Sequence, residues 1–198
     1  MRQFRFSARK NEQMLYTREE IFQITIKQCS SGKQMKTNSY IKKIAEKISC
    51  TNKITIGRTC DMLEVTFRTS NNAFPLILHN VAPFRISING FIIVTNLDFF
   101  KPLYDNYDKF DCYMKGSISQ FDQLVKYNNL DSVEIESIIF QYCQKGDLII
   151  GFTYGNHHAK LEVFNNAQNN DDSEAWRFFE YKSGKEHFVQ YCNHACVE

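Results

Sequence analysis

The segment Arg85-Ile86-Ser87-Ile88-Asn89-Gly90-Phe91-Ile92-Ile93-Val94-Thr95 predicts an antiparallel β-hairpin. Asn89 and Gly90 both tolerate positive φ, which a type I′ turn requires at its two central positions. The residues on either side are rich in β-branched and aromatic types, which favour strands. The turn therefore pairs Arg85–Ile88 with Phe91–Thr95.

Similar apolar runs, separated by turn residues, predict strands along most of the chain. These runs are Lys53–Ile56, Met62–Thr69, Phe74–Leu78, Lys109–Lys115, Val133–Gln141, Leu148–Tyr154, Lys160–Phe164, Trp176–Tyr181 and Glu186–Cys192. The intervening segment Gly57–Asp61 suits a hairpin loop, and the last third has the pattern of a β-meander. In total we expect about nine to eleven strands.

Helical spacing is clearest in Ser39–Ile48, where the apolar residues form one stripe along a helix. A second helix is expected from Ser119 to Tyr127, with Ser119 as its cap. A short helix at 97–104 would follow Asn96, and the pattern in 17–26 suits a helix or a strand. The polar stretch Ser30–Asn38 is expected to be a loop.

These patterns predict an α+β fold: a single compact domain, mostly antiparallel β-hairpins and meander, with two to four helices. Of its 198 residues, 43% are apolar and 23% charged, which is typical of a globular protein. Residues 1–16 are expected to be a basic N-terminal arm or an edge strand, and residues 17–198 the domain. The polar loop 165–173 is expected to be flexible.

Several features bear on the cellular compartment. The longest wholly apolar run, Phe91–Val94, is far shorter than the ~20 residues that a membrane-spanning helix needs. The first twenty residues lack the apolar core of a secretory signal. Seven irregularly spaced cysteines indicate reduced thiols rather than a disulfide framework. The sequence therefore predicts a cytoplasmic or nuclear protein.

Charge is unevenly distributed along the chain. Residues 1–60 hold 13 Lys/Arg against 4 Asp/Glu, whereas residues 61–198 hold 11 against 18. Such asymmetry is typical of a basic segment with an anionic partner. The alternative is that the basic and acidic parts attract each other within one fold.

RNA is the anionic partner that this asymmetry favours, because each cation on a phosphate releases a counterion. The candidate nucleic-acid contacts are Arg2, Phe4, Arg5, Phe6, Arg9, Lys10, Lys33, Lys36, Lys42, Lys43 and Lys47. Phe4 and Phe6 would stack on unpaired bases, or else lie in the core as part of an edge strand. No motif of a known nucleic-acid-binding fold accompanies these residues.

No catalytic signature is present, and we expect no cofactor. Cys192, His194 and Cys196 carry zinc-binding groups, but in an extended strand they lie ~6.6 Å apart, too far to share one ion. Whether they bind metal is left open. Cys143 and His157-His158 form a conceivable nucleophile pair that nothing in the sequence brings together. Glu134 and Glu136 alternate with apolar residues, as on a solvated strand face.

Aromatic residues make up 14% of the chain, and aromatic residues are enriched at protein interfaces. In a strand, one ring of a doublet such as Phe99-Phe100 or Phe178-Phe179 must point away from the core. Such a doublet indicates a sheet covered on both faces, or else a docking surface.

Three classes of function remain. The first is a non-enzymatic protein that binds RNA or a ribonucleoprotein through its basic N-terminal third, the ribosome being one concrete partner. The second is a protein-interaction or self-assembling structural protein that uses aromatic-rich strands. The third, which the pattern favours least, is an enzyme that depends on Cys143 or a C-terminal zinc site.

Overall fold

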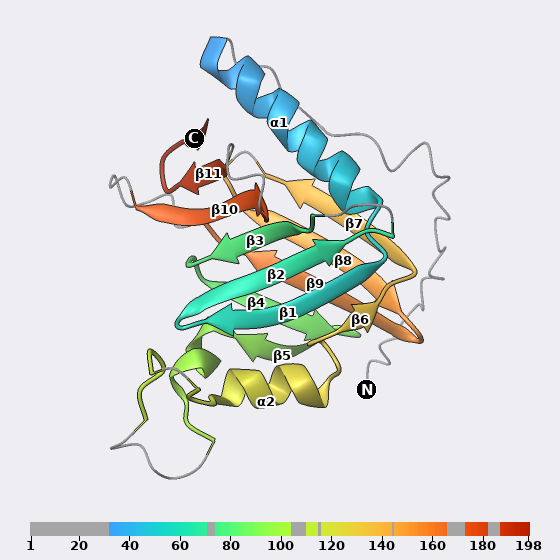
Figure 1. Ribbon diagram of the computed structural model, residues 1–198, viewed down its shortest axis with the longest axis vertical. Helices are drawn as coiled ribbons and strands as arrows, with labels where there is room; N and C mark the ends of the chain where they lie inside the picture. Colours follow the sequence, from blue (N-terminus) through green and yellow to red (C-terminus); the bar gives the residue numbers. More distant parts are fainter. Residues whose placement is uncertain are drawn as a thin grey trace, which may run out of the picture.

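The computed structural model describes residues 32–70, 74–103, 110–114, 116–143, 145–165, 173–181 and 187–198, with side chains from residue 39 onward. Within these residues, twelve strands form two antiparallel sheets accompanied by two α-helices (Figure 1). The protein is therefore α+β and mostly antiparallel, as the sequence predicts. The expected arm at 1–16 and the helix or strand at 17–26 lie outside the described residues, as do positions 166–172 of the expected loop.

The larger sheet has seven strands in the order β12-β11-β10-β3-β2-β1-β6. Their bounds are β1 (Lys53–Thr59), β2 (Met62–Arg68), β3 (Leu76–Asn80), β6 (Val133–Glu134), β10 (Glu174–Glu180), β11 (Phe188–Tyr191) and β12 (Ala195–Val197). The two outermost strands, β6 and β12, have only two and three residues. Strands this short leave no readable alternation, which is why the sequence does not predict them separately.

The smaller sheet has five strands in the order β5-β4-β9-β8-β7. Their bounds are β4 (Phe84–Ile88), β5 (Phe91–Thr95), β7 (Ser137–Tyr142), β8 (Leu148–Tyr154) and β9 (His157–Val163). The predicted single strand Val133–Gln141 is wrong, because the chain changes sheets within it. The Ile135 amide bonds to Asn52 beside the larger sheet, and the Glu136 amide bonds to Thr153 of the smaller one.

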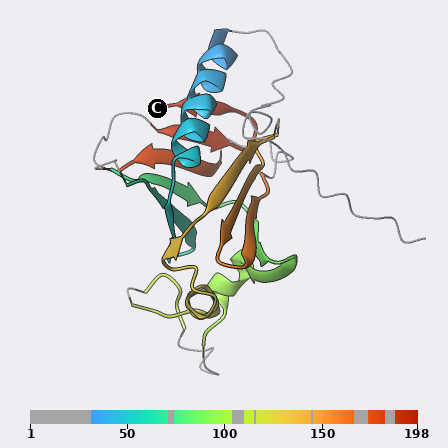
Figure 2. The same cartoon turned by 90° about the vertical axis from the view of Figure 1, so that its right-hand side faces the viewer.

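The inward faces of the two sheets meet in one apolar core (Figure 2). Alternate residues of each strand point into it, as the sequence pattern requires. Trp176, Phe178 and Phe188 enter from the larger sheet, and Ile86 and Leu161 from the smaller one; each is at most 1% exposed. Fully burying one such side chain contributes roughly 1.5–3 kcal/mol before conformational entropy is counted. This burial is what holds the sheets together.

The two helices close opposite ends of the space between the sheets (Figures 1 and 2). Helix α1 (Gly32–Ser49) packs against β7 and β12 through Ile41, Ile44 and Ile48. Helix α2 (Gln120–Tyr127) packs against β5 and β1, next to the short 3₁₀ helix η2 (Asn96–Phe100). The helix predicted from Ser119 to Tyr127 is confirmed.

The hairpin predicted from Asn89-Gly90 is confirmed. Asn89 and Gly90 have φ values of 51° and 86°, and Ile88 pairs with Phe91 across a two-residue turn. Asn89 also ties this turn to β9, because its side-chain oxygen accepts the His158 amide at 2.9 Å.

Three local predictions are wrong. The expected loop Ser30–Asn38 is helical from Gly32 onward, so α1 begins seven residues before Ser39. The expected strand Lys109–Lys115 contains turns and no strand among its described residues, because Asp111 accepts amide hydrogen bonds there. The expected helix at 97–104 is a 3₁₀ helix that ends at Phe100, before Pro102.

Candidate functional site

The predicted nucleic-acid contacts fall into three groups. Outside the described residues lie Arg2, Phe4, Arg5, Phe6, Arg9 and Lys10. Only the backbone is described for Lys33 and Lys36, which belong to α1. Exposed side chains on α1 belong to Lys42, Lys43 and Lys47. The structure therefore places three of these eleven side chains, all of them on one helix.

Carboxylates from the acidic part of the chain neutralise most of the described cations from the basic part. Lys47 pairs with Glu180. Lys53 lies 3.3 Å from Glu134, and Arg58 lies 2.9 Å from Asp122. Only two other cationic side chains are described before residue 61, those of Lys42 and Lys43. These three pairs fit the alternative in which the basic and acidic parts attract each other.

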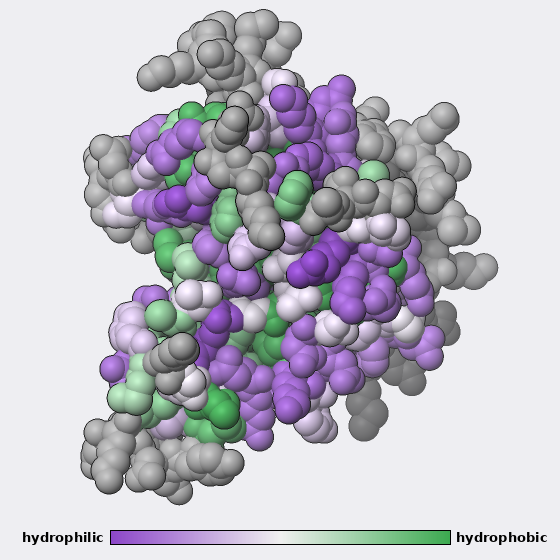
Figure 3. Space-filling model, viewed as in Figure 1, coloured by the Kyte–Doolittle hydropathy of each residue, from purple (hydrophilic) through white to green (hydrophobic). Residues whose placement is uncertain are grey.

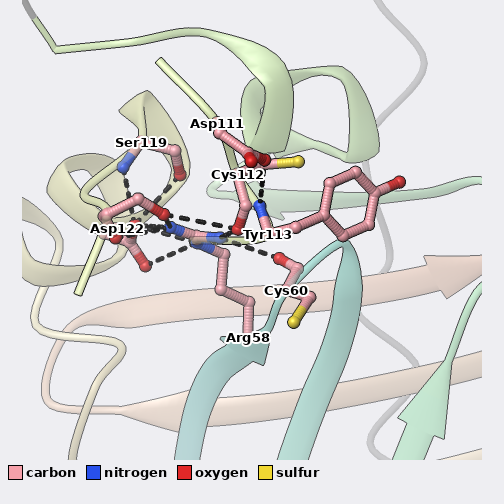
Figure 4. Close-up of polar contacts among 8 residues, drawn as sticks. Arg58, Cys60, Asp111, Cys112, Tyr113, Ser119 and Asp122 are labelled. Carbon is pink, nitrogen blue, oxygen red and sulfur yellow. Dashed lines mark hydrogen bonds and ion pairs between the residues drawn. The ribbon is translucent and has the colours of Figure 1, made fainter. Parts of the chain in front are cut away.

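Arg58 is the most fully bonded cation of this set (Figure 4). Its side chain is 7% exposed, and its Nε donates to Asp122 at 2.9 and 3.1 Å. Nη1 donates to the carbonyls of Cys60 and Cys112 at 2.8 and 3.1 Å, and Nη2 donates to that of Ser117 at 2.8 Å. All three nitrogens thus meet protein acceptors. We call these five residues the Arg58 clamp.

The clamp also fixes the beginning of α2. Asp122 Oδ2 accepts hydrogen bonds from the amide and hydroxyl of Ser119, at 2.7 and 3.0 Å. This arrangement satisfies the Ser119 amide, which has no partner inside the helix. Ser119 forms a bridge with Pro102, and the Gln120 amide donates to Lys101 O at 2.7 Å. The end of η2, the described residues of the loop 110–118 (110–114 and 116–118) and the start of α2 are therefore held together.

Within loop 110–118, hydrogen bonds to Asp111 set the backbone. Asp111 Oδ1 accepts the Tyr113 amide at 2.8 Å, and Asp111 O accepts the Met114 amide at 3.1 Å. Tyr113 Oη donates to Asp61 at 3.1 Å, and this hydrogen bond raises the pKa of the phenol. The turn between β1 and β2, which carries Asp61, thus orients Tyr113, and the Tyr113 side chain remains exposed to solvent.

Five large hydrophobic side chains on η2 and this loop are at least half exposed. They are Leu97 (62%), Phe100 (50%), Tyr113 (60%), Met114 (62%) and Ile118 (58%). We call them the apolar end surface; hydrophobic residues gather at this end of the molecule in Figure 3, at the lower left. The antiparallel Pro102–Ser119 bridge brings the chain just after η2 and the end of this loop together. Grouped exposed apolar residues mark binding surfaces more often than isolated ones do.

Cys192, His194 and Cys196 do not lie in one extended strand. The chain turns after β11, where the Tyr191 amide donates to His194 O at 2.8 Å. Cys192 is buried, whereas the His194 ring stacks on Tyr191. Among the described residues, no three His, Cys, Asp or Glu side chains lie close enough to hold a metal ion.

Cys143 and the histidine pair lie at opposite ends of the smaller sheet. Tyr142 is paired with Leu148 at one end of β8, and Tyr154 with His157 at the other. Six residues along a strand span about 20 Å, too far for a Cys–His nucleophile pair. Burial also raises the pKa of Cys143, which disfavours the reactive thiolate.

The aromatic doublets divide between core and surface. Phe99 is buried and Phe100 is half exposed. Phe178 is buried, whereas the Phe179 ring lies against those of His79 and His187, at centroid distances of 4.7 and 5.0 Å. Phe99 and Phe100 lie in a 3₁₀ helix rather than in a strand. Only Phe100 contributes to the apolar end surface.

Neither the clamp nor the apolar end surface is predicted by the sequence. Arg58 stands in an expected hairpin loop, and its acceptors lie between 2 and 64 residues away. Met114 lies in the expected strand Lys109–Lys115, and Ile118 lies outside every expected element. The available signal is the number of aromatic and aliphatic residues between Leu97 and Ile118; among the described ones Phe99 is buried, whereas Leu97, Phe100, Tyr113, Met114 and Ile118 are exposed.

No family model, curated protein or solved structure matches this chain. In the part of the chain that the structure describes, no helix is long and apolar enough to cross a membrane.

Proposed function

We propose that this protein is a non-enzymatic protein-interaction module, and that the apolar end surface contacts its partner. One observation carries the proposal: five large hydrophobic side chains are exposed at one end of the fold, where a buried arginine holds the backbone of Cys112 and Ser117 in place. Trp176, Phe178 and Phe188 on the strands lie in the core, and we therefore propose η2 and loop 110–118 as the contact surface.

Two physical arguments support this assignment. Aromatic residues and Met are enriched in the buried centres of protein interfaces, and Phe100, Tyr113 and Met114 are of these types. A surface that is ordered before binding loses less conformational entropy when the partner arrives. The Arg58 clamp provides that order, because its hydrogen bonds join β1, loop 110–118 and α2.

The test compares two triple variants in capture experiments from an extract. Leu97→Ser, Met114→Ser and Ile118→Ser remove apolar area from the proposed surface. The matched control removes it elsewhere and consists of Phe74→Ser, Val81→Ser and Val197→Ser, which are 45%, 53% and 37% exposed. Captures are washed at 50 mM and 500 mM salt and treated with ribonuclease.

We expect the native chain and the control to retain the same partner at both salt concentrations, because salt does not screen apolar contacts. The surface variant should lose that partner while keeping its circular dichroism spectrum. Equal capture by all three proteins contradicts the proposal. Sedimentation velocity distinguishes self-assembly, in which the partner is a second copy of this chain.

A second candidate function is binding to RNA or a ribonucleoprotein through the basic N-terminal third. The observation that favours it is the exposed pair Lys42 and Lys43 on α1, which forms no ion pair with the described carboxylates. Co-sedimentation with ribosomes and total RNA across a salt series tests it. Several phosphate contacts predict a steep loss of binding between 50 and 200 mM salt. A complex that persists at 200 mM, or no complex at all, contradicts this candidate.

Both candidate functions assume the same domain organisation. We infer that residues 17–198 form one domain that carries a basic arm at 1–16, in a cytoplasmic or nuclear protein. Deleting residues 1–10 should weaken RNA binding without unfolding the domain. It should leave the partner of the apolar end surface bound.

A further inference from the structure

The outer face of the smaller sheet is hollowed into a groove of about 490 Å³. It lies on β5-β4-β9-β8-β7, on the face opposite the core, and is distinct from the apolar end surface. Small-molecule sites in proteins typically have volumes of roughly 300–1,000 Å³.

One row of paired residues across the five strands explains the hollow. Ile139 pairs with Gly151, Gly151 with Lys160, Lys160 with Ser87, and Ser87 with Ile92. The isoleucines stand on the two outermost strands, 45% and 57% exposed, about 19 Å apart at the usual strand spacing. Gly151 supplies no side chain between them. A Cβ added there would meet only a backbone oxygen at 4.0 Å.

A buried carboxylate organises the charged side of the groove. Glu162 is 8% exposed, and an ion so buried requires partners. Arg85 Nε donates to its Oε2 at 2.7 Å, and Lys160 Nζ lies 3.1 Å from its Oε1. These contacts lower the pKa of Glu162, the hydrogen bond from Arg85 contributing most. Two cations therefore share one carboxylate, which leaves a local charge of about +1.

Arg85 is held on two sides while its terminal nitrogens remain available. Its guanidinium carbon lies 5.3 Å from the centre of the Phe164 ring, and Nε is bound to Glu162. Among the described residues, no hydrogen bond involves Nη1 or Nη2 of Arg85. These two nitrogens form the fork that binds carboxylate or phosphate with two parallel hydrogen bonds.

We propose that this groove binds a small amphiphilic organic anion, a carboxylate or a phosphate monoester attached to an apolar body. Arg85 and Lys160 hold the anionic group, and Ile92 or Ile139 contacts the apolar body. The hollow over Gly151 admits the ligand between them. This site is independent of the proposed protein partner.

The test is a titration of the full chain followed by amide chemical shifts, with hexanoate, hexyl phosphate and neutral hexanamide as probes. We expect at least one anion to shift amides of β4, β8 and β9, with a Kd on the order of 1 mM for so small a ligand. Hexanamide should bind at least tenfold more weakly. The anion that binds more tightly identifies which headgroup the site prefers.

Two glycines provide matched variants. Gly151→Leu fills the groove, and Gly57→Leu places the same side chain in equally open space on β1. Neither glycine has positive φ, so both strands accept leucine. We expect Gly151→Leu to weaken anion binding at least tenfold and Gly57→Leu to change it less than twofold.

Arg85→Gln should also weaken binding at least tenfold, with Arg68→Gln as its exposed control. Removing Arg85 affects Glu162 as well. If the Arg85→Gln variant does not fold, the result with Gly151→Leu decides the test. Three results would overturn the proposal: no shift with either anion, equal binding of hexanamide, or undiminished binding to Gly151→Leu.

Discussion

Replacing Arg58 with methionine should destabilise the protein by about 3 kcal/mol. Breaking a buried ion pair by removing one partner costs roughly 3–5 kcal/mol. The lower end applies here, because Asp122 is 30% exposed and keeps two hydrogen bonds from Ser119. The carbonyls of Cys112 and Ser117 lose charged donors and account for part of the loss.

Urea unfolding followed by tryptophan fluorescence measures this effect. Trp176 is the only tryptophan and is fully buried, so its emission reports on the core. With a urea dependence of ~2 kcal/mol per molar, a loss of ~3 kcal/mol lowers the midpoint by ~1.5 M. Arg68→Met, at an exposed strand end, should stay within about 0.5 kcal/mol of the native chain.

A loss below ~1 kcal/mol for Arg58→Met would refute the reasoning, because water would then replace the arginine without cost. A second measurement distinguishes a local effect of the Arg58 clamp from a loss of stability throughout the protein. Amide hydrogen exchange should accelerate in loop 110–118 and at the start of α2 more than in β8 and β9. Uniform acceleration would mean that Arg58 does not hold this loop in particular.

Three further predictions concern other parts of the fold. Gly90→Ala should cost about 1–2 kcal/mol because φ is 86° there, whereas Gly57→Ala should be close to neutral in thermal unfolding. Gly146→Ala should cost more than Gly90→Ala in the same assay, since its Cβ would also approach side-chain atoms at 2.6 Å. Glu162 has a lowered pKa, so its contribution to stability is complete above its unfolded pKa of about 4.3 and is lost as pH falls through the folded value. The stability difference between the native chain and Glu162→Gln should therefore be larger at pH 7 than at pH 3; an equal difference at both contradicts the role of Arg85.

Local signals explain which parts of the fold are predictable. Asn89-Gly90 defines its turn without help from distant residues, and Phe121 and Val125 are spaced as an amphipathic helix requires. Val133–Gln141 has an unbroken strand pattern, yet the chain changes sheets at Ile135. That change depends on Asn52 and Thr153, which are remote in sequence. Periodicity cannot report such long-range hydrogen bonds.

The candidate sites are less predictable than the fold, for the same reason. The role of Arg58 depends on Asp122, Cys112 and Ser117, and no spacing in the sequence links these residues. The groove over Gly151 exists because sheet pairing aligns this glycine with Ile139. The uneven charge of the sequence marks the basic segment, but it does not show that Lys47, Lys53 and Arg58 pair with later carboxylates.

Site-specific photo-cross-linking tests the central claim most directly, since it reports what touches the apolar end surface in the cell. A photoreactive amino acid at position 114 is compared with one at position 81, which is also exposed but is not one of the five residues of this surface. We predict that position 114 yields a discrete protein adduct, that position 81 does not, and that Arg58→Met abolishes the adduct. The same adducts from both positions, or none from position 114, would contradict the account.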